Sequence, residues 1–301
     1  MNNLQGWINL YKPKNISSFQ VLKKIKKKFL IDKIGHAGTL DPMAEGILPI
    51  AIGKATKLIS YVNLNLKKYE FKVEWGKQTT SDDSTGSIMY ESNLIPSDKE
   101  ILSKINEFTG SIIQSPPKVS AVKINGQRAY KLHRDDKIFE TNPKNVFVKY
   151  IKVLKNTKKD TTFELESGKG FYVRSFARDI SHKLGTYGHI SYLNRIKVGK
   201  FTTDKSILLD DLMKIVQRQS LINFIHSSVS MLDDILAYEI EDKKDLDDLC
   251  KGKSIKIDVK KIKKFDLTSQ DKNLIFLSKS GDIVSIGKLI GNLFKPSKVL
   301  I

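Results

Sequence analysis

Residues 35–57 read GHAGTLDPMAEGILPIAIGKATK, a segment that combines four glycines, an Asp41–Pro42 step and a run of apolar residues. Asp is a favourable helix N-cap and Pro fits the first helical position, so the pair alone is typical of a turn. A carboxylate that stays ionised in apolar surroundings needs a cationic partner. Arg174, in the segment GFYVRSFARD, is a candidate partner, but sequence spacing alone does not show that the two residues meet.

The composition indicates a folded protein with one large domain, or a large domain and a small one. The chain has 301 residues, of which 40% are hydrophobic and 9% aromatic. No apolar run reaches the roughly 18 residues of a membrane-spanning helix, and residues 1–15 do not have the pattern of a signal peptide. Cys250 is the only cysteine, which excludes an internal disulfide. We therefore expect a cytoplasmic protein.

The charge favours a nucleic acid partner. Lys and Arg number 52 against 33 Asp and Glu, which gives a net charge of +19. Such a surface attracts polyanions through long-range steering and counterion release. An AT-rich genome would explain the preference for Lys over Arg, but it would not explain the excess of bases over acids. Nucleic acid is therefore favoured over a membrane surface.

The first elements predicted along the chain are a strand at residues 4–11 and a helix that Ser17 and Gln20 open as a capping box. The helix is expected to bury an apolar face formed by Phe19, Leu22, Ile25 and Phe29. Its remaining surface is basic, with Lys23, Lys24, Lys26, Lys27 and Lys28. Two interpretations of the basic face stay open: a solvated helix face and a stripe that faces phosphates.

The following segments predict a mixed α+β domain. Alternation from Tyr69 to Trp75 predicts a strand, and Ser97 with Glu100 predicts a second capped helix that ends at Gly110. Residues 146–154 and 161–166 predict a hairpin, and residues 174–184 a helix. Strands and helices alternate without a regular βαβ period. After residue 232, short apolar strands between turns predict a small β-rich module that packs on the rest of the chain.

Several common site motifs are absent from the sequence. The stretch GILPIAIGKAT has Leu48 where a phosphate loop needs its first glycine, and its hydroxyl residue, Thr56, comes one position too late. There is no G-x-G-x-x-G, no H-E-x-x-H and no G-x-S-x-G, and a single cysteine cannot form a zinc ribbon. The residues therefore leave two possibilities, an enzyme without a metal or nucleotide cofactor and a binding protein.

The segment at 35–57 resembles the catalytic segment of the bacterial tRNA pseudouridine synthases of the TruB type, which modify uridine 55 in the TΨC loop. The resemblance continues in order through INLYKPKNISS, KKYEFKVEWGKQTTSDD, QSPPKVSAVKINGQRAYKLHR, GFYVRSFARDISHKLG and GHISYLNRIKVGKF. It spans about residues 6–202, whereas the tail after 232 resembles the family's small PUA-like module more loosely.

The resemblance implies an α+β fold with a mixed, mainly antiparallel sheet. It implies a catalytic domain at 1–232 with an RNA-clasping insertion at about 115–142, and a PUA-like module at 233–301. The expected activity is isomerisation of uridine to pseudouridine in tRNA, by base flipping and without a cofactor or metal. The expected partner is the TΨC stem-loop of tRNA, and the expected state is a monomer.

The resemblance also assigns residues. Asp41 falls on the family's nucleophile, Tyr69 on the tyrosine that stacks on the target base, and Arg174 on the arginine that pairs with the aspartate. His36 matches the histidine that enters the RNA loop. Further RNA-contacting or pocket positions are Lys12, Tyr172, Asp83 and Leu193, and in the insertion Lys123, Arg128, Lys131 and Arg134.

Some positions depart from the family pattern: Thr80, Val119, Phe171 and Asp136. They affect RNA-contacting segments and leave Asp41, Tyr69 and Arg174 in place. Two alternatives are a guide-RNA-dependent relative that acts on ribosomal RNA, and a non-catalytic protein that binds RNA or helps tRNA to fold. The second alternative predicts an altered Asp41 or Arg174, and neither is altered.

Overall fold

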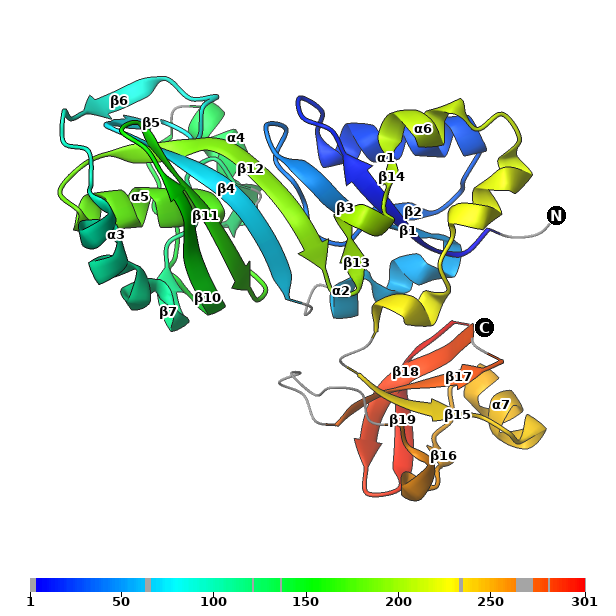
Figure 1. The fold of residues 1–301 in the computed structure, drawn as a ribbon. Coiled ribbons are helices and arrows are strands. Elements are labelled where there is room, and N and C mark those ends of the chain that lie inside the picture. Colours follow the sequence, from blue (N-terminus) through cyan, green and yellow to red (C-terminus); the bar gives the residue numbers. More distant parts are fainter. Residues whose placement is uncertain are drawn as a thin grey trace. The chain divides into compact units, whose positions relative to one another are not determined.

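A computed structural model describes residues 4–62, 66–120, 122–135, 137–232, 235–263, 273–280 and 282–300 (Figure 1). The chain divides into two compact units, and each is built from separate stretches of sequence. The first comprises Met1–Leu40, Ile47–Asn65 and Val198–Ile301, and the second comprises Asp41–Gly46 and Leu66–Lys197. Among the described residues, no helix is long and apolar enough to cross a membrane.

The N-terminal part of the first unit is a sheet edge with helices. Its strands follow the order β14-β1-β3, with β14 parallel to β1 and β2 antiparallel to β3. The strands here are β1 (Gly6–Lys12), β2 (Ile34–His36), β3 (Glu45–Ile52), β13 (Phe201–Thr202) and β14 (Ile207–Leu208). The helices are α1 (Ser18–Phe29), α2 (Ile59–Val62) and α6 (Leu209–Lys214), with short 3-10 turns η1 (Gly53–Leu58), η3 (Thr203–Lys205), η4 (Arg218–Phe224) and η5 (Ser228–Met231).

The predicted capping box of α1 is confirmed. The Ser17 hydroxyl accepts a hydrogen bond from the Gln20 amide, and the Gln20 side chain accepts one from the Ser17 amide. The predicted apolar face is wrong at its start, because Phe19 is 73% exposed. The buried positions are Ser18, Val21, Ile25 and Phe29, which lie on one side of a helix with 3.6 residues per turn. That side is also the one from which Ser18 reaches its partner, Leu40.

The C-terminal stretch of the first unit is a β-rich module, as predicted. Its five strands follow the order β15-β17-β18-β19-β16. They are β15 (Leu236–Glu239), β16 (Ile255–Lys256), β17 (Leu274–Lys279), β18 (Asp282–Ile290) and β19 (Leu293–Val299). The module also contains α7 (Lys243–Cys250) and η6 (Val259–Lys261), which the sequence pattern did not predict.

The C-terminal module shares a core with the N-terminal part of the same unit. One cluster of buried side chains includes Trp7 and Ala55 together with Phe276 and Ile286. A second cluster, which includes Leu277, lies within the module itself. The two faces of β17 therefore serve two cores, since neighbouring residues of a strand point to opposite sides.

The second unit is a largely antiparallel sheet with two helices, α3 and α5, on one face (Figure 1). Its strands follow the order β12-β4-β11-β10-β7. They are β4 (Lys67–Trp75), β7 (Gly110–Gln114), β10 (Lys144–Asn156), β11 (Asp160–Ser167) and β12 (Gly188–Val198). Two smaller hairpins are formed by β5 (Lys77–Thr79) with β6 (Ile88–Glu91), and by β8 (Lys123–Ile124) with β9 (Gln127–Arg128). The helices are α3 (Asp98–Ile105), α4 (Ala129–Arg134) and α5 (Val173–Lys183), with η2 (Asn106–Phe108) after α3.

Most of the elements predicted for the second unit are confirmed. Strand β4 alternates between buried and half-buried residues, and β10 pairs with β11 as an antiparallel hairpin. The capping box of α3 is present, but the helix ends at Ile105 instead of Gly110, because a 3-10 turn follows. Phe176 of α5 lies edge-on against Phe71 of β4 and Phe163 of β11. This aromatic cluster fixes α5 on the sheet.

Candidate active site

Asp41 and Arg174, which the sequence could not place together, are in contact. The Arg174 Nη2 lies 2.9 Å from the Asp41 Oδ2. Arg174 is the second residue of α5 and is 4% exposed, whereas the Asp41 side chain is 35% exposed. The carboxylate is thus held by a buried cation while one of its sides stays accessible. This arrangement orients the carboxylate and leaves it accessible to a substrate.

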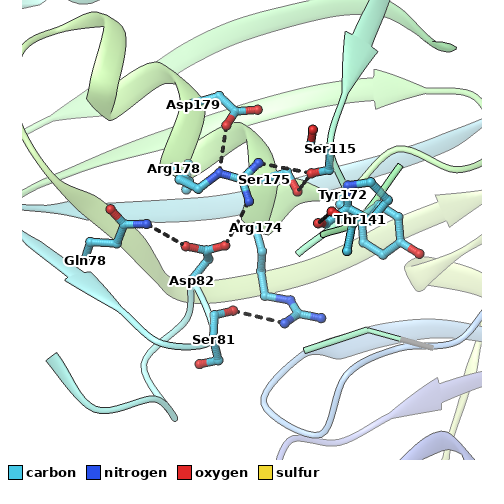
Figure 2. Close-up of polar contacts among 12 residues, drawn as sticks. Gln78, Ser81, Asp82, Ser115, Thr141, Tyr172, Arg174, Ser175, Arg178 and Asp179 are labelled. Carbon is cyan, nitrogen blue, oxygen red and sulfur yellow. Dashed lines mark hydrogen bonds and ion pairs between the residues drawn. The ribbon is translucent and has the colours of Figure 1, made fainter. Parts of the chain in front are cut away.

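Two other acceptors fix the Arg174 guanidinium. Its Nη1 donates to the Ser81 carbonyl at 3.0 Å (Figure 2). The same Nη1 lies 3.6 Å from Asp83 Oδ2. Asp83 is itself fixed, because it accepts hydrogen bonds from the Ser81 hydroxyl at 2.7 Å and the Thr85 amide at 3.0 Å. The loop after β5 therefore orients the arginine. A planar guanidinium can serve several acceptors at once, which an ammonium on a flexible chain does less well.

Arg178 lies one turn further along α5 and contacts the same loop after β5, at Asp82. It donates to Asp179 at 2.8 Å and to the Ser115 carbonyl at 3.0 Å, and it lies 3.3 Å from Asp82 (Figure 2). Burial raises the pKa of Asp82, and the charge of Arg178 opposes that rise. Arg178 thus acts on the shape of the loop rather than on Asp41.

The loop that carries Asp41 is anchored at both ends. On the N-terminal side, the Ser18 hydroxyl donates to the Leu40 carbonyl at 2.8 Å and accepts from the Leu40 amide at 2.9 Å. On the C-terminal side, Gly46 pairs with Arg195 of β12. A Cβ on Gly46 would lie 2.3 Å from the Arg195 carbonyl oxygen, and the φ of Gly46 is +108°. Only glycine allows this close approach without strain.

Tyr69 lies beside a buried arginine that the sequence interpretation did not select. Tyr69 is 8% exposed on β4, and Arg195 of the neighbouring strand β12 is 1% exposed. The Arg195 guanidinium donates a hydrogen bond to the Tyr69 hydroxyl, and the charge of Asp41 acts on it as well. Burial lowers the pKa of Arg195, and these two neighbours oppose that effect. Because arginine can only donate, the phenolic oxygen must be the acceptor.

A second buried cation lies on the same face of β4, two residues before Tyr69. Lys67 is 7% exposed. Burial lowers the pKa of its ammonium, and together with the charges of Arg195 and Lys169 it brings the pKa to about 7. Lys67 is thus a group near Tyr69 that changes its charge close to neutral pH.

Tyr172 and Leu193 belong to the same unit as Asp41. Tyr172 is the N-cap residue of α5, where its amide donates to the Gln114 side chain at 2.8 Å. Burial raises the pKa of the Tyr172 phenol, with Arg174 opposing and Asp41 adding to the rise. Leu193 is 5% exposed on β12, two residues from Arg195. Both residues can line the surroundings of Asp41.

His36 and Lys12 belong to the first unit. His36 ends β2 and pairs with Ile50. Lys12 is fully buried, and its ammonium donates to the Pro13 and Ile16 carbonyls at 2.8 Å each. These contacts hold the loop that leads into α1, so they give Lys12 a structural role.

The cations of the insertion are placed on an exposed surface. Lys123 lies on β8, Arg128 on β9, and Lys131 and Arg134 on α4, and all four are exposed. The Nε of Arg134 lies 3.5 Å from Asp135. Asp136 lies outside the described residues. The β8–β9 hairpin and α4 thus present a basic surface to solvent.

Arg195 could have been found in the sequence. In GHISYLNRIKV, Leu193 and Arg195 are two residues apart and therefore share one face of a strand. An arginine on the apolar face of a buried strand requires a partner, and this was the available signal. Its partners come from two other segments, so the sequence alone does not identify them.

The fold and this constellation define the class of protein as a pseudouridine synthase. The chain aligns with a chain in the crystal structure of a Cbf5-Nop10-Gar1 complex with a TM-score of 0.75 and 25% identity, which covers 98% of this chain and 85% of that one. Residues 26–173 match the model of the TruB family pseudouridylate synthase N-terminal domain. Residues 174–248 match the model of the tRNA pseudouridylate synthase B C-terminal domain.

Individual relatives agree with the family models. The chain is 38% identical to the tRNA pseudouridine synthase B of Ehrlichia ruminantium, over 98% of this chain and 99% of that protein. It is 46% identical to the protein of the same name from Wolbachia pipientis, over 70% of this chain and 60% of that protein. The chain belongs to the TruB family of pseudouridylate synthases.

Proposed function

We propose that this protein is a tRNA pseudouridine synthase that isomerises uridine 55 in the TΨC loop. The observation that carries the proposal is the contact between Asp41 and the buried Arg174 at 2.9 Å, in a chain that belongs to the TruB family. In the reaction the N1–C1′ bond breaks and a C5–C1′ bond forms. A proton leaves C5 and a proton arrives at N1, so no oxidant or reductant is consumed.

The proposed roles follow from the chemistry of each side chain. Asp41 is the nucleophile, because its carboxylate can form a covalent bond and later leave. Arg174 pairs with the Asp41 carboxylate and orients it. Tyr69 offers a flat face against which the extruded uracil stacks, since the target base has to leave the RNA stack before it can react. Tyr172 and Leu193 line the same pocket.

The remaining residues are proposed to bind RNA or to support the segments that do. His36 enters the RNA loop that the target base leaves. Asp83 contacts the RNA and also orients Arg174. The insertion at about 115–142 contacts phosphates through its exposed cations, which position the RNA without reading its sequence: Lys123, Arg128, Lys131 and Arg134. Lys12 supports the loop before α1.

We also propose the domain organisation that the sequence predicted: a catalytic domain at 1–232 and a PUA-like module at 233–301. The C-terminal β sheet and its own buried cluster support a separate function for the module. We propose a cytoplasmic protein that acts as a monomer and needs neither a guide RNA nor an obligate protein partner.

The test is to incubate unmodified tRNA with the purified wild-type chain and with Asp41→Asn, and to map pseudouridine. The wild type should convert position 55 without any added RNA or protein, and Asp41→Asn should form no product while it still binds tRNA. Product from Asp41→Asn at the wild-type rate would refute the nucleophile. Binding without product in the wild type would instead favour a non-catalytic RNA-binding protein.

A further inference from the structure

Phe19 is an exposed aromatic residue in the first turn of α1, and this turn is hydrogen bonded to the residue that precedes Asp41. Ser18, its neighbour, is 2% exposed and is joined to Leu40 by two hydrogen bonds of 2.8 and 2.9 Å. Leu40 directly precedes Asp41. The first turn of α1 is therefore fixed to the residue that precedes Asp41 in the chain, and Phe19 is one residue from this attachment point.

Phe19 is the most exposed aromatic residue in the part of the chain that the structure describes. Its exposed fraction is 73%, whereas those of Tyr90 and Phe147 are 50% and 44%. A phenyl ring left in water gives up the favourable free energy of burial. The buried face of α1 begins at Ser18 and continues through Val21, so the ring is directed away from the core of its own unit.

The helix surface on the same side as Phe19 is basic. Lys23 and Lys26 follow Phe19 by four and seven residues, which places them on one side of the helix. Both are exposed, and α1 contains no acidic residue. Among the residues that the structure describes, neither lysine pairs with a carboxylate. The lysines thus need a counter-charge from outside the chain.

An aromatic ring flanked by unpaired cations has the chemistry of a site for unpaired nucleotides. Bases or riboses stack on the ring, and lysines neutralise the phosphates on either side. A folded protein partner with an acidic apolar patch would also match the charge. RNA is favoured because Ser18, the neighbour of Phe19, is hydrogen bonded to Leu40, and the substrate of this protein has to reach the next residue, Asp41.

We propose that Phe19, with Lys23 and Lys26, forms a second contact for the tRNA loop, in which the ring stacks on an unpaired nucleotide next to the target and the lysines bind its phosphates. The inference rests on the proposed function, because it takes tRNA as the substrate. It also resolves the two interpretations of the basic face of α1 in favour of phosphate binding.

The experiment measures tRNA binding by fluorescence anisotropy in the Asp41→Asn background, so that no turnover interferes. Phe19→Ala should raise the Kd roughly 5-fold to 100-fold, the range for one lost base–aromatic stack, and Phe19→Trp should retain the wild-type Kd. Phe224→Ala serves as the control for loss of an exposed phenyl ring, since Phe224 lies in η4 and is 36% exposed. It should leave the Kd unchanged.

Salt dependence separates the ring from the lysines. Lys23→Ala should reduce the slope of log Kd against log salt by about 0.7–0.9, the value for one lost phosphate contact, while Phe19→Ala should leave the slope unchanged. Lys104→Ala is the matched control, because Lys104 already pairs with Glu107 at 3.1 Å. Because Phe19 is exposed, thermal unfolding should show the same Tm for Phe19→Ala as for the wild type.

A Kd of Phe19→Ala equal to that of the wild type would overturn the proposal. If the variant instead lost self-association in sedimentation while it bound tRNA normally, a second copy of the chain would be the occupant, and the RNA contact would again be refuted. Failure of the proposed function can be distinguished from failure of the Phe19 proposal. In the first case the wild type would bind tRNA without forming pseudouridine. The Phe19 proposal is tested by tRNA binding alone.

Discussion

At the residue scale, the geometry of the candidate site depends on the hydrogen-bond and ion-pair partners of the Arg174 and Arg195 guanidinium groups. Arg174 contacts Asp41, Ser81 and Asp83. The sequence YVRS predicts that Arg174 lies at the start of a helix. It does not predict the three partners, because they come from two separate loops. Arg195 is similar. Its donation to the Tyr69 hydroxyl depends on the adjacency of β12 and β4, which are about 120 residues apart in the chain.

The hydrogen bond from Arg195 to Tyr69 leads to the first prediction. Arg195→Met should lower the single-turnover rate roughly 10-fold to 100-fold, the scale for loss of a hydrogen bond that involves a charged group. In a Tyr69→Phe background the same substitution should cost much less, because the acceptor is already gone. Rapid-quench assays with radiolabelled tRNA measure all four rates.

Arg178→Met is the control for this cycle, since it removes a largely buried guanidinium that does not contact Tyr69. Its effect should be the same with and without the Tyr69 hydroxyl. Equal losses for Arg195→Met in both backgrounds would contradict the coupling. Unchanged tRNA affinity in Arg195→Met would show that the effect is on the reaction and not on binding.

Lys67 leads to a prediction about stability and pH. Its pKa is about 7 in the folded protein against a reference value of 10.5, so between these values the unfolded chain binds a proton that the folded chain does not. The free energy of unfolding should therefore rise with pH above 7, and below pH 7 the cost of the buried charge is present in full. From pH 7 to 9 this one group contributes a rise of about 2 kcal/mol.

Urea unfolding of the wild type and Lys67→Met at pH 6 to 9 measures this effect. The difference between the two proteins should be largest at low pH, where the methionine variant is the more stable, and should shrink as the pH rises. Lys68→Met is the control, because the hydrogen bond to Glu164 raises the pKa of Lys68 and both states stay protonated in this range. A pH-independent difference for Lys67→Met would contradict the lowered pKa.

At the element scale, local signals predicted the elements better than their faces. Both capping boxes, the alternation of β4 and the β10–β11 hairpin follow from neighbouring residues, and all are confirmed. The predicted buried face of α1 is confirmed at Ile25 and Phe29 but wrong at Phe19, because Ser18, which is bonded to Leu40, takes the buried position in the first turn. Tertiary contacts of this kind override hydrophobic spacing.

The close approach of β3 and β12 leads to a prediction for Gly46. An alanine Cβ there would lie 2.3 Å from the Arg195 carbonyl oxygen, at a φ of +108°. Gly46→Ala should cost roughly 2–4 kcal/mol of unfolding free energy, since both strain and a backbone displacement are needed. It should also slow pseudouridine formation, because Asp41 is five residues away in the same loop.

Gly110→Ala is a matched control for backbone conformation without close approach. Gly110 has a φ of +79°, and a Cβ there would have no atom within 4 Å. This variant should cost only about 1 kcal/mol. Urea unfolding compares the two substitutions, and equal costs would show that the contact with β12 is not what requires glycine at position 46.

At the scale of the whole molecule, composition and charge predicted the class of partner but not the division of the chain. The net charge of +19 favours RNA, and this needed no structure. The two compact units could not be predicted, because each is assembled from separate stretches of the sequence. Asp41 itself lies in a six-residue stretch, Asp41–Gly46, that belongs to the second unit although the residues on both sides of it belong to the first. Such a division depends on long-range strand pairing, which local sequence patterns do not encode.

The shared core of the first unit leads to the last prediction, for a chain that ends at Leu232. Trp7 and Ala55 are fully buried in one cluster with Phe276 and Ile286, and the Lys57 ammonium donates to the Val299 carbonyl at 2.9 Å. Removal of residues 233–301 would expose this apolar surface. The Tm should fall by roughly 10 °C or more, since the loss of each large buried side chain costs a few kcal/mol.

Phe276→Ala in the full chain is the comparison variant for this truncation. It removes one large side chain from the shared cluster while the module stays in place, so it should lower the Tm by a smaller amount. Differential scanning calorimetry measures all three proteins. A shortened chain with the wild-type Tm would mean that the N-terminal part of this unit folds independently of the module.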